Sequence, residues 1–273
     1  MLSTDLVLLS NDDGYSSPGL AALESAFARH ARTVVVAPET EQSATSHSLS
    51  LHRPLRMRSV REGVFAIDGT PADCVYVALH ATPLDVHGPT GEVDPKRVLI
   101  PKLPRIVVSG INLGLNLGQD VFYSGTVAAA REGALRGVPS MAVSMGMSSG
   151  ARFEPAAEVA ARLALRLLAA TRPAGLAPLL NVNFPAGRTS YEGVRATRLG
   201  RRNYDETVVL RHDPRGHEYF WIGGPNAYHE RVEGSDTDAV DDGFVSVSPL
   251  VLDATAPDHL GLAAFVAGDG ALP

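Results

Sequence analysis

Short apolar runs alternate with helical patterns along about the first two thirds of the chain. Runs bounded by polar or turn residues, typical of strands buried on both faces, occupy residues 6–10, 33–37, 64–67, 105–109, 140–145 and 179–184. The spacing of apolar residues predicts helices at residues 18–30, 71–81, 124–136 and 156–170. Alternating strands and helices predict the α/β class, with a three-layer, doubly wound, Rossmann-like and mostly parallel sheet.

The pattern changes after Pro185. The segments ETVVLRH and HEYFWIGG read as strands, and the turn DPRG at residues 213–216 joins them into a C-terminal β-hairpin extension. We therefore expect an α/β core at 1–185 and a β-rich extension and C-terminal segment at 186–273, used for oligomerisation and packed on the core as one domain. His212 and His217 flank the turn, and we expect an ordinary cross-strand pair there, because no third metal ligand is near.

Composition narrows the function classes. The net charge of −6 and the lack of a basic run exclude a nucleic-acid surface, and no run reaches the roughly 20 apolar residues of a membrane span. Cys74 is the sole cysteine, so an intramolecular disulfide is excluded and we expect a cytoplasmic protein. Residues 85–104 hold four prolines and two glycines, which predicts an irregular surface insertion.

Two adjacent acids, Asp12 and Asp13, follow the first expected strand. Ligands of open α/β sheets bind at the carboxyl ends of the strands, which is where these acids should lie. Two neighbouring carboxylates repel each other, and one would have to take up a proton unless a cation lies between them. The pair therefore predicts a metal site.

Further oxygen ligands follow the neighbouring strands. Ser43 lies in the loop after the second strand, and Asn112 follows the strand at 105–109, although both types are more often turn formers. With Asp12 and Asp13 they form an all-oxygen set that favours one hard divalent cation, Mg²⁺ or Mn²⁺ before Ca²⁺. Such a cation suits phosphoryl hydrolysis. Whether water, Asp12 or Asp13 is the nucleophile stays open.

Candidate phosphate contacts lie in the same region. The Asn116 amide can donate to an anion, and Gly110 lets backbone approach a ligand closely. Ser124, Gly125 and Thr126 open an alanine-rich helix whose free N–H groups could hold a phosphate, although Ser124 could instead only cap that helix.

Single features of the sequence suggest three other functions. A haloacid-dehalogenase-type phosphatase needs a second acid two residues after the first, but position 14 is glycine. A serine hydrolase is suggested by GMSSG at 146–150, but the helix does not follow directly, so we expect a flexible loop. A non-catalytic sensor of nucleotides or phosphate would carry the same binding residues, and only turnover separates it from an enzyme.

The motifs together resemble one family. SNDDG, APETEQSATSHSLS, VVSGINLGLNLG, YSGTVAAAREG, LNVNFP, TRLGRRNY and DPRGHEYFWIGG, in this order, are similar to the SurE family of stationary-phase survival nucleotidases. The resemblance implies a metal-dependent 5′/3′-nucleotidase that acts on nucleoside monophosphates and in some members on short polyphosphate. It also implies a dimer or tetramer built through the C-terminal hairpin.

The family's residues fall on those already singled out. The resemblance places its metal ligands on Asp12, Asp13, Ser43 and Asn112. It places its phosphate contacts on Asn116, Ser124, Gly125 and Thr126, with Gly110 close by.

Overall fold

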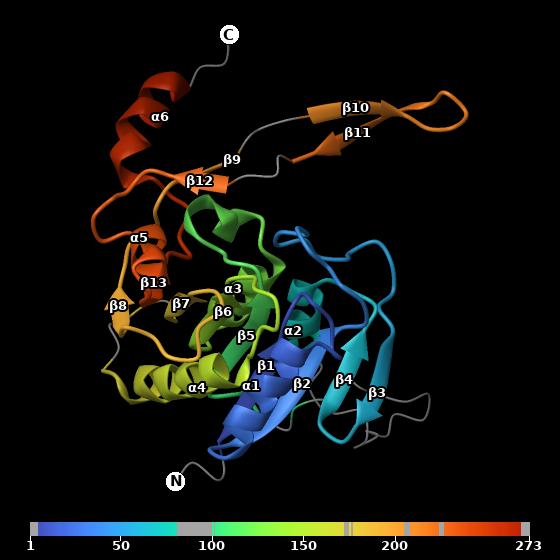
Figure 1. The fold of residues 1–273 in the computed structure, drawn as a ribbon, viewed down its shortest axis with the longest axis vertical. Helices are drawn as coiled ribbons and strands as arrows, with labels where there is room; N and C mark the ends of the chain where they lie inside the picture. Colours follow the sequence, from blue (N-terminus) through green and yellow to red (C-terminus); the bar gives the residue numbers. More distant parts are fainter. Residues whose placement is uncertain are drawn as a thin grey trace.

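The computed structural model describes residues 5–80, 100, 102–171, 175, 177–204, 208–223 and 227–268. Within these residues a nine-stranded sheet runs through the centre of the molecule (Figure 1). From edge to edge its strands are β3 (Met57–Arg61), β4 (Val64–Ile67), β2 (Arg32–Pro38), β1 (Leu6–Ser10), β5 (Ile106–Leu113), β6 (Ser140–Met145), β7 (Leu179–Phe184), β13 (Val245–Leu250) and β8 (Val194–Ala196).

The centre of the sheet is parallel. The six strands from β4 to β7 pair in parallel, while β3 and β13 run antiparallel to β4 and β7, and β8 lies parallel to β13. The expected α/β class with a mostly parallel, doubly wound sheet is confirmed. The carboxyl ends of β1, β2 and β5 therefore lie at one edge of the sheet, where the candidate residues were expected.

Helices cover both faces of the sheet. They are α1 (Pro18–Ala28), α2 (Pro71–His80), α3 (Gly125–Leu135), α4 (Glu154–Ala169) and α5 (Asp236–Asp241). Helix α6 (Leu260–Ala267) stands apart from the sheet, and η2 (Gly118–Phe122) and η3 (Pro257–His259) are short 3₁₀ turns. Val7 and Leu9 of β1 pack with α1 and α4, whereas Leu6 and Leu8 pack with α2 and α3 on the other face. Because side chains of a strand alternate between faces, a strand buried on both sides needs an unbroken apolar run.

The sheet differs from the expectation in three places, and the first is the edge strand β3, which was not expected because its mostly exposed residues carry no apolar run. Strand β5 continues through Leu113 rather than ending at Ser109, because Ile111 is fully buried and a register shift against β6 accommodates the extra residues. Strands β8 and β13 lie after Pro185 and complete the core sheet. Residues 85–99 and 101 of the expected insertion lie outside the described residues.

The hairpin projects from the body of the molecule (Figure 1). Its strands β10 (Val208–His212) and β11 (Glu218–Ile222) pair with each other, and a second ribbon forms from β9 (Arg202–Tyr204) and β12 (Ala227–His229). The expected His212–His217 pair is wrong. His212 lies opposite Glu218, while the His217 side chain contacts Asp213 inside the turn, at 3.1 Å. Among the described helices none has the length and apolarity needed to cross a bilayer.

Candidate active site

An acidic cavity of about 450 Å³ opens at the carboxyl ends of β1, β2 and β5. The four expected metal ligands all line it, and so do Asn116 and Ser124 of the expected phosphate contacts. These six residues are Asp12, Asp13, Ser43, Asn112, Asn116 and Ser124. The structure therefore brings together side chains that are as far as 112 positions apart in the sequence (124 − 12).

Asp12 is held from the N-terminus of α3. The backbone N–H of Thr126 donates to Asp12 Oδ2 at 3.1 Å, and the Thr126 hydroxyl donates to Oδ1. Gly125 permits this approach, because a Cβ there would lie 2.9 Å from the Cβ of Asp12. The Asp12 side chain is thus fixed within an almost closed environment, since only 4% of the residue is exposed.

The two neighbouring acids affect each other's charge. Burial, and next the negative charge of Asp12, raise the pKa of Asp13 to about 6. Burial also raises the pKa of Asp12, although the two bonds from Thr126 oppose that shift. The raised pKa values are the cost of placing two carboxylates side by side away from water, and a bound cation would lower both.

Ser43 and Asn112 complete the expected ligand set. The Ser43 hydroxyl donates to Glu41 Oε1 at 2.7 Å, so its oxygen keeps lone pairs for a cation. The Asn112 amide donates through Nδ2 to the Gly114 carbonyl at 2.8 Å, which leaves its oxygen as the atom able to bind a metal. Both side chains can therefore supply neutral oxygen ligands.

Asn116 is held by three polar side chains beneath the cavity. Its backbone N–H donates to Asn183 Oδ1 at 2.8 Å, and its Nδ2 donates to Ser144 Oγ at 2.7 Å. Its carbonyl accepts from Asn181 Nδ2 at 2.7 Å. The side-chain amide keeps one further N–H, which could reach an anion in the cavity.

The other expected phosphate contacts occupy different positions. Ser124 caps α3, because its Oγ accepts from the Val127 N–H at 3.1 Å, and its own proton stays available to a ligand. Thr126 is fully buried and its hydroxyl is committed to Asp12. Gly110 lies against β6, where a Cβ would come within 2.2 Å of the Val143 carbonyl oxygen.

Several lining residues were not expected from the sequence. They are Glu41, Asp120, Tyr123 and Tyr204. Asp120 accepts from Tyr204 OH at 2.5 Å and from Arg202 Nη1 at 2.6 Å. Glu41 could have been found, because it shares the loop of Ser43, whereas the approach of Tyr204 depends on the path of β9.

Four acids line the cavity, Asp12, Asp13, Glu41 and Asp120, and none of its described lining residues is lysine or arginine. Arg202 neutralises Asp120 from outside this lining, so Asp12, Asp13 and Glu41 remain without a basic partner among the described residues. No group of three His, Cys, Asp or Glu side chains suited to a metal occurs among the described residues, so a metal here would need the neutral oxygens of Ser43 and Asn112 as well. This donor set fits a hard divalent cation.

An adjoining cavity of about 490 Å³ shares Asp120, Tyr123 and Tyr204 with the acidic cavity. Tyr228, Asn203, Arg202 and Gln119 complete its lining. Tyr123 and Tyr228 are 67% and 56% exposed, so their rings are accessible to a ligand. The two cavities together offer an acidic end and an aromatic end.

Comparisons with known proteins all identify SurE proteins as similar to this chain. A family model described as Survival protein SurE matches residues 7–206. A protein of Sorangium cellulosum named 5'-nucleotidase SurE is 58% identical and covers 98% of this chain and 99% of its own length. A protein of Myxococcus xanthus with the same name is 48% identical, covering 93% of this chain and 89% of its own length.

A solved structure is also similar. The crystal structure of the SurE protein from Aquifex aeolicus superimposes with a TM-score of 0.80 at 38% identity, covering 96% of this chain and 100% of its own. The similarity therefore extends over both the core and the C-terminal part of the chain.

Proposed function

The chain belongs to the SurE family, and from this membership we propose that it is a nucleotidase, a phosphatase that releases phosphate from nucleoside 5′-monophosphates. Two relatives that match along nearly their whole length carry the name 5'-nucleotidase. The observation that carries the proposal is the placement of Asp12 and Asp13, at the carboxyl edge of the sheet and in a cavity wide enough for a small phosphate ester.

We propose that one divalent cation, Mg²⁺ or Mn²⁺, binds to Asp12, Asp13, Ser43 and Asn112. Asp12, Asp13 and Glu41 line the cavity with no ion pair to a described residue, so without a cation it would repel a phosphate dianion. A bound cation would neutralise the acids, polarise the phosphoryl oxygen and lower the pKa of a bound water.

The chain's own residues would position the substrate. Ser124 can donate its hydroxyl proton to a phosphate oxygen, and Asn116 can donate its second amide N–H. Thr126 would not contact the phosphate directly, because its backbone N–H and its hydroxyl both donate to Asp12. We propose Ser124 and Asn116 as phosphate contacts, with Gly125 allowing the helix end to approach and Gly110 supporting β5 against β6.

The adjoining aromatic cavity suits the nucleoside end of the substrate. Tyr123 and Tyr228 present exposed rings, and base stacking on an aromatic ring tolerates any base. We propose that the base lies there while its phosphate reaches the acidic cavity. The open cavity also supports the wider range that the family resemblance implies, which includes nucleoside 3′-monophosphates and short polyphosphate.

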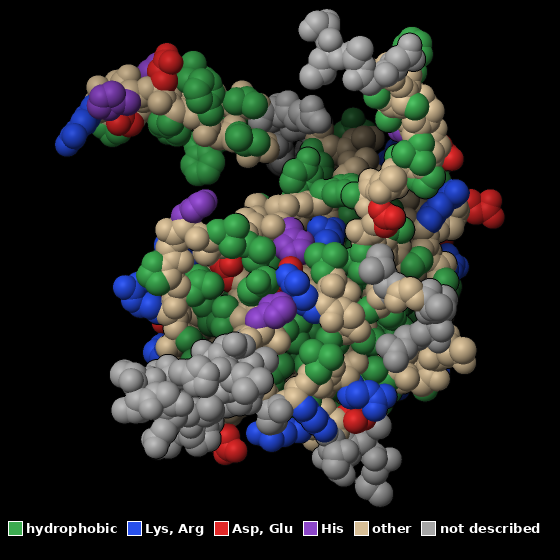
Figure 2. Space-filling model, turned by 180° about the vertical axis from the view of Figure 1, so that it is seen from behind, with side chains coloured by type: hydrophobic (Ala, Val, Ile, Leu, Met, Phe, Trp, Pro, Cys, Tyr) green, Lys and Arg blue, Asp and Glu red, His purple; other side chains and the backbone are tan. Residues whose placement is uncertain are grey.

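We propose that the protein is a homo-oligomer. Strand β11 exposes Phe220, Trp221 and Ile222, with exposed fractions of 62%, 65% and 88%. Figure 2 shows hydrophobic side chains along the projecting hairpin. Helix α6 has no buried residue within the described chain, although it carries Leu262 and Phe265. Exposed apolar surface of this extent is typical of an interface between subunits, and an isolated two-stranded ribbon is marginal in water.

We also propose a cytoplasmic location. Its support is Cys74, which is buried as a free thiol.

A substrate panel tests the proposed activity. Purified protein with Mn²⁺ is assayed for phosphate release from nucleoside 5′- and 3′-monophosphates, from tripolyphosphate and from p-nitrophenyl phosphate. We expect turnover of nucleoside monophosphates to exceed that of p-nitrophenyl phosphate, because only the nucleotides fill the aromatic cavity. Binding of nucleotides without any phosphate release would instead identify a sensor and refute the proposed activity.

A further inference from the structure

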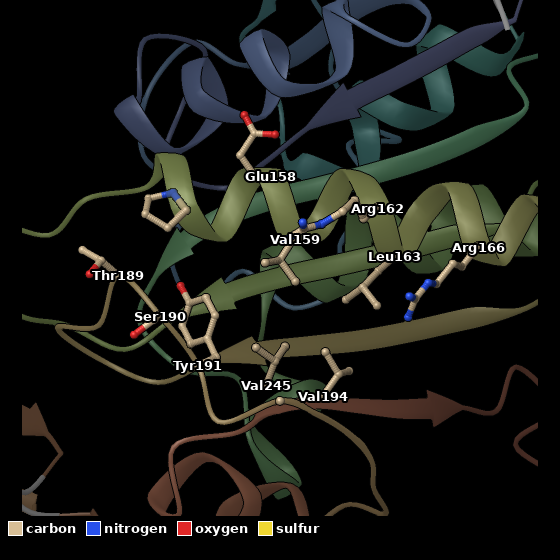
Figure 3. Close-up of a pocket in the computed structure, with 12 residues that line it drawn as sticks. Glu158, Val159, Arg162, Leu163, Arg166, Thr189, Ser190, Tyr191, Val194 and Val245 are labelled. Carbon is tan, nitrogen blue, oxygen red and sulfur yellow. The ribbon is translucent and has the colours of Figure 1, made fainter. Parts of the chain in front are cut away.

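A separate cavity of about 470 Å³ lies beside α4 (Figure 3). Helix α4 forms one wall, residues 189–194 form another, and Val245 of β13 contributes to the lining. We call it the α4 cavity. It shares no lining residue with the acidic cavity or with the adjoining aromatic cavity, so a ligand in it would make separate contacts.

Two arginines give the α4 cavity a positive rim. Arg162 and Arg166 lie four residues apart on α4 and thus on one side of the helix. Both are exposed, and no ion pair or hydrogen bond joins either guanidinium to a described residue. Glu158, the one acid among the described lining residues, is already paired with Arg29, which directly follows α1. An excess of positive charge therefore remains in a protein whose net charge is −6.

The rest of the lining is mostly apolar. Val159 and Leu163 of α4 face the cavity together with Val194, Val245 and the ring of Tyr191. Figure 3 shows Leu163 and Arg166 pointing to the side of α4 on which Val194 and Val245 lie. The Tyr191 ring is braced edge-on against Phe184, with ring centroids 5.2 Å apart, so this wall is preformed.

We propose that the α4 cavity is a second ligand site, which binds a small organic anion through Arg162 and Arg166. A phosphate or carboxylate group would lie on the two guanidinium groups, whose planar donors match either anion. An aromatic or aliphatic body would lie on Leu163, Val159 and the Tyr191 ring. The cavity volume is within the range of about 300 to 1,000 Å³ that is typical of small-molecule sites.

The experiment uses the full chain in EDTA, where the acidic cavity has no cation and repels anions. Phenylphosphonate and benzoate, two probes with an aromatic body, are titrated and followed by ligand-observed NMR. Arg166→Gln should weaken binding by about tenfold or more, because it removes charge-assisted hydrogen bonds. Arg32→Gln removes the same charge from an exposed position on β2 and should leave binding unchanged.

The two probes and inorganic phosphate separate the possible sources of binding. Tighter binding of phenylphosphonate than benzoate would assign the site to organic phosphates, and the reverse order to carboxylates. Inorganic phosphate should bind more weakly than the preferred probe, because it cannot use the apolar wall. The proposal is overturned if neither probe binds, if Arg166→Gln binds like the wild type while melting at the same temperature, or if inorganic phosphate binds equally well.

Discussion

At the scale of single residues, the backbone N–H and the hydroxyl of Thr126 both donate to the carboxylate of Asp12. The sequence pattern suggested a phosphate contact at Thr126, because the residue opens a helix. The structure gives its hydroxyl a partner inside the protein. We infer that Thr126 positions Asp12, and this changes what its replacement should do.

Thr126→Val keeps the side-chain volume and removes the hydroxyl bond to Asp12. A hydrogen bond to a charged group contributes about 1.5 to 3 kcal/mol, so we expect both metal affinity and turnover to fall by about tenfold or more. Thr126→Ser should restore both. Calorimetric titration of Mn²⁺ and phosphate release from AMP check this. Loss of turnover with unchanged Mn²⁺ affinity would instead indicate that Thr126 contacts the phosphate of the substrate.

Asp12→Asn removes one negative charge and keeps the shape of the side chain. We expect turnover to fall by about a hundredfold or more, because a lost or misplaced cation forfeits several kcal/mol of transition-state stabilisation. The protein should stay folded, because the lost repulsion between Asp12 and Asp13 opposes the loss of one acceptor oxygen for the two Thr126 donors, and circular dichroism checks this. Asp253→Asn, at an exposed position far along the chain, is the control. A rate near that of the control would place the metal elsewhere.

At the scale of elements, the six parallel strands from β4 to β7 and the helices α1 to α4 could be predicted because each carries its own signal. The apolar runs of β1, β6 and β7 match their observed bounds, and GMSSG lies in the loop before α4 as expected. The end of β5 could not be placed, since glycine and asparagine usually end a strand. Only the burial of Ile111 between the layers shows why this strand continues.

The N-terminus of α3 combines a structural and a functional role in Ser124. Ser124→Ala removes the cap on Val127, so the protein should lose about 1 kcal/mol of stability. It also removes the free hydroxyl proton in the cavity, so inhibition by inorganic phosphate should weaken by about tenfold. Melting temperature and the phosphate inhibition constant, measured on the same variant, separate the roles. An unchanged inhibition constant would leave Ser124 as a cap alone.

At the scale of the whole molecule, the candidate site draws on distant parts of the chain. Asp12, Ser43 and Asn112 could be assembled from the sequence, because each follows a strand and parallel strands end at one edge. Tyr204 and Asp120 could not, because they meet only through the return of the chain after the core sheet. The α4 cavity could not be predicted from the sequence either, because its arginines look like ordinary exposed residues of an amphipathic helix.

The exposed apolar side chains of β11 predict an assembly of several copies. Light scattering at micromolar concentration should give a mass of at least twice the 28.8 kDa of one chain. Trp221→Ser together with Ile222→Ser should lower the mass toward that of a monomer, because both side chains are exposed on the projecting hairpin. Met147→Ser, at a position 74% exposed outside the hairpin, is the matched control. A monomeric wild type would refute the assembly.

We propose that Asp12 and Asp13 hold one divalent cation and that phosphate release depends on it. The most direct test is the rate of phosphate release from AMP by EDTA-treated protein as Mn²⁺ is added back. We expect no measurable release in EDTA and a rate that rises with Mn²⁺ until one ion per chain is bound. Undiminished release in EDTA would show that phosphate release needs no cation at Asp12 and Asp13.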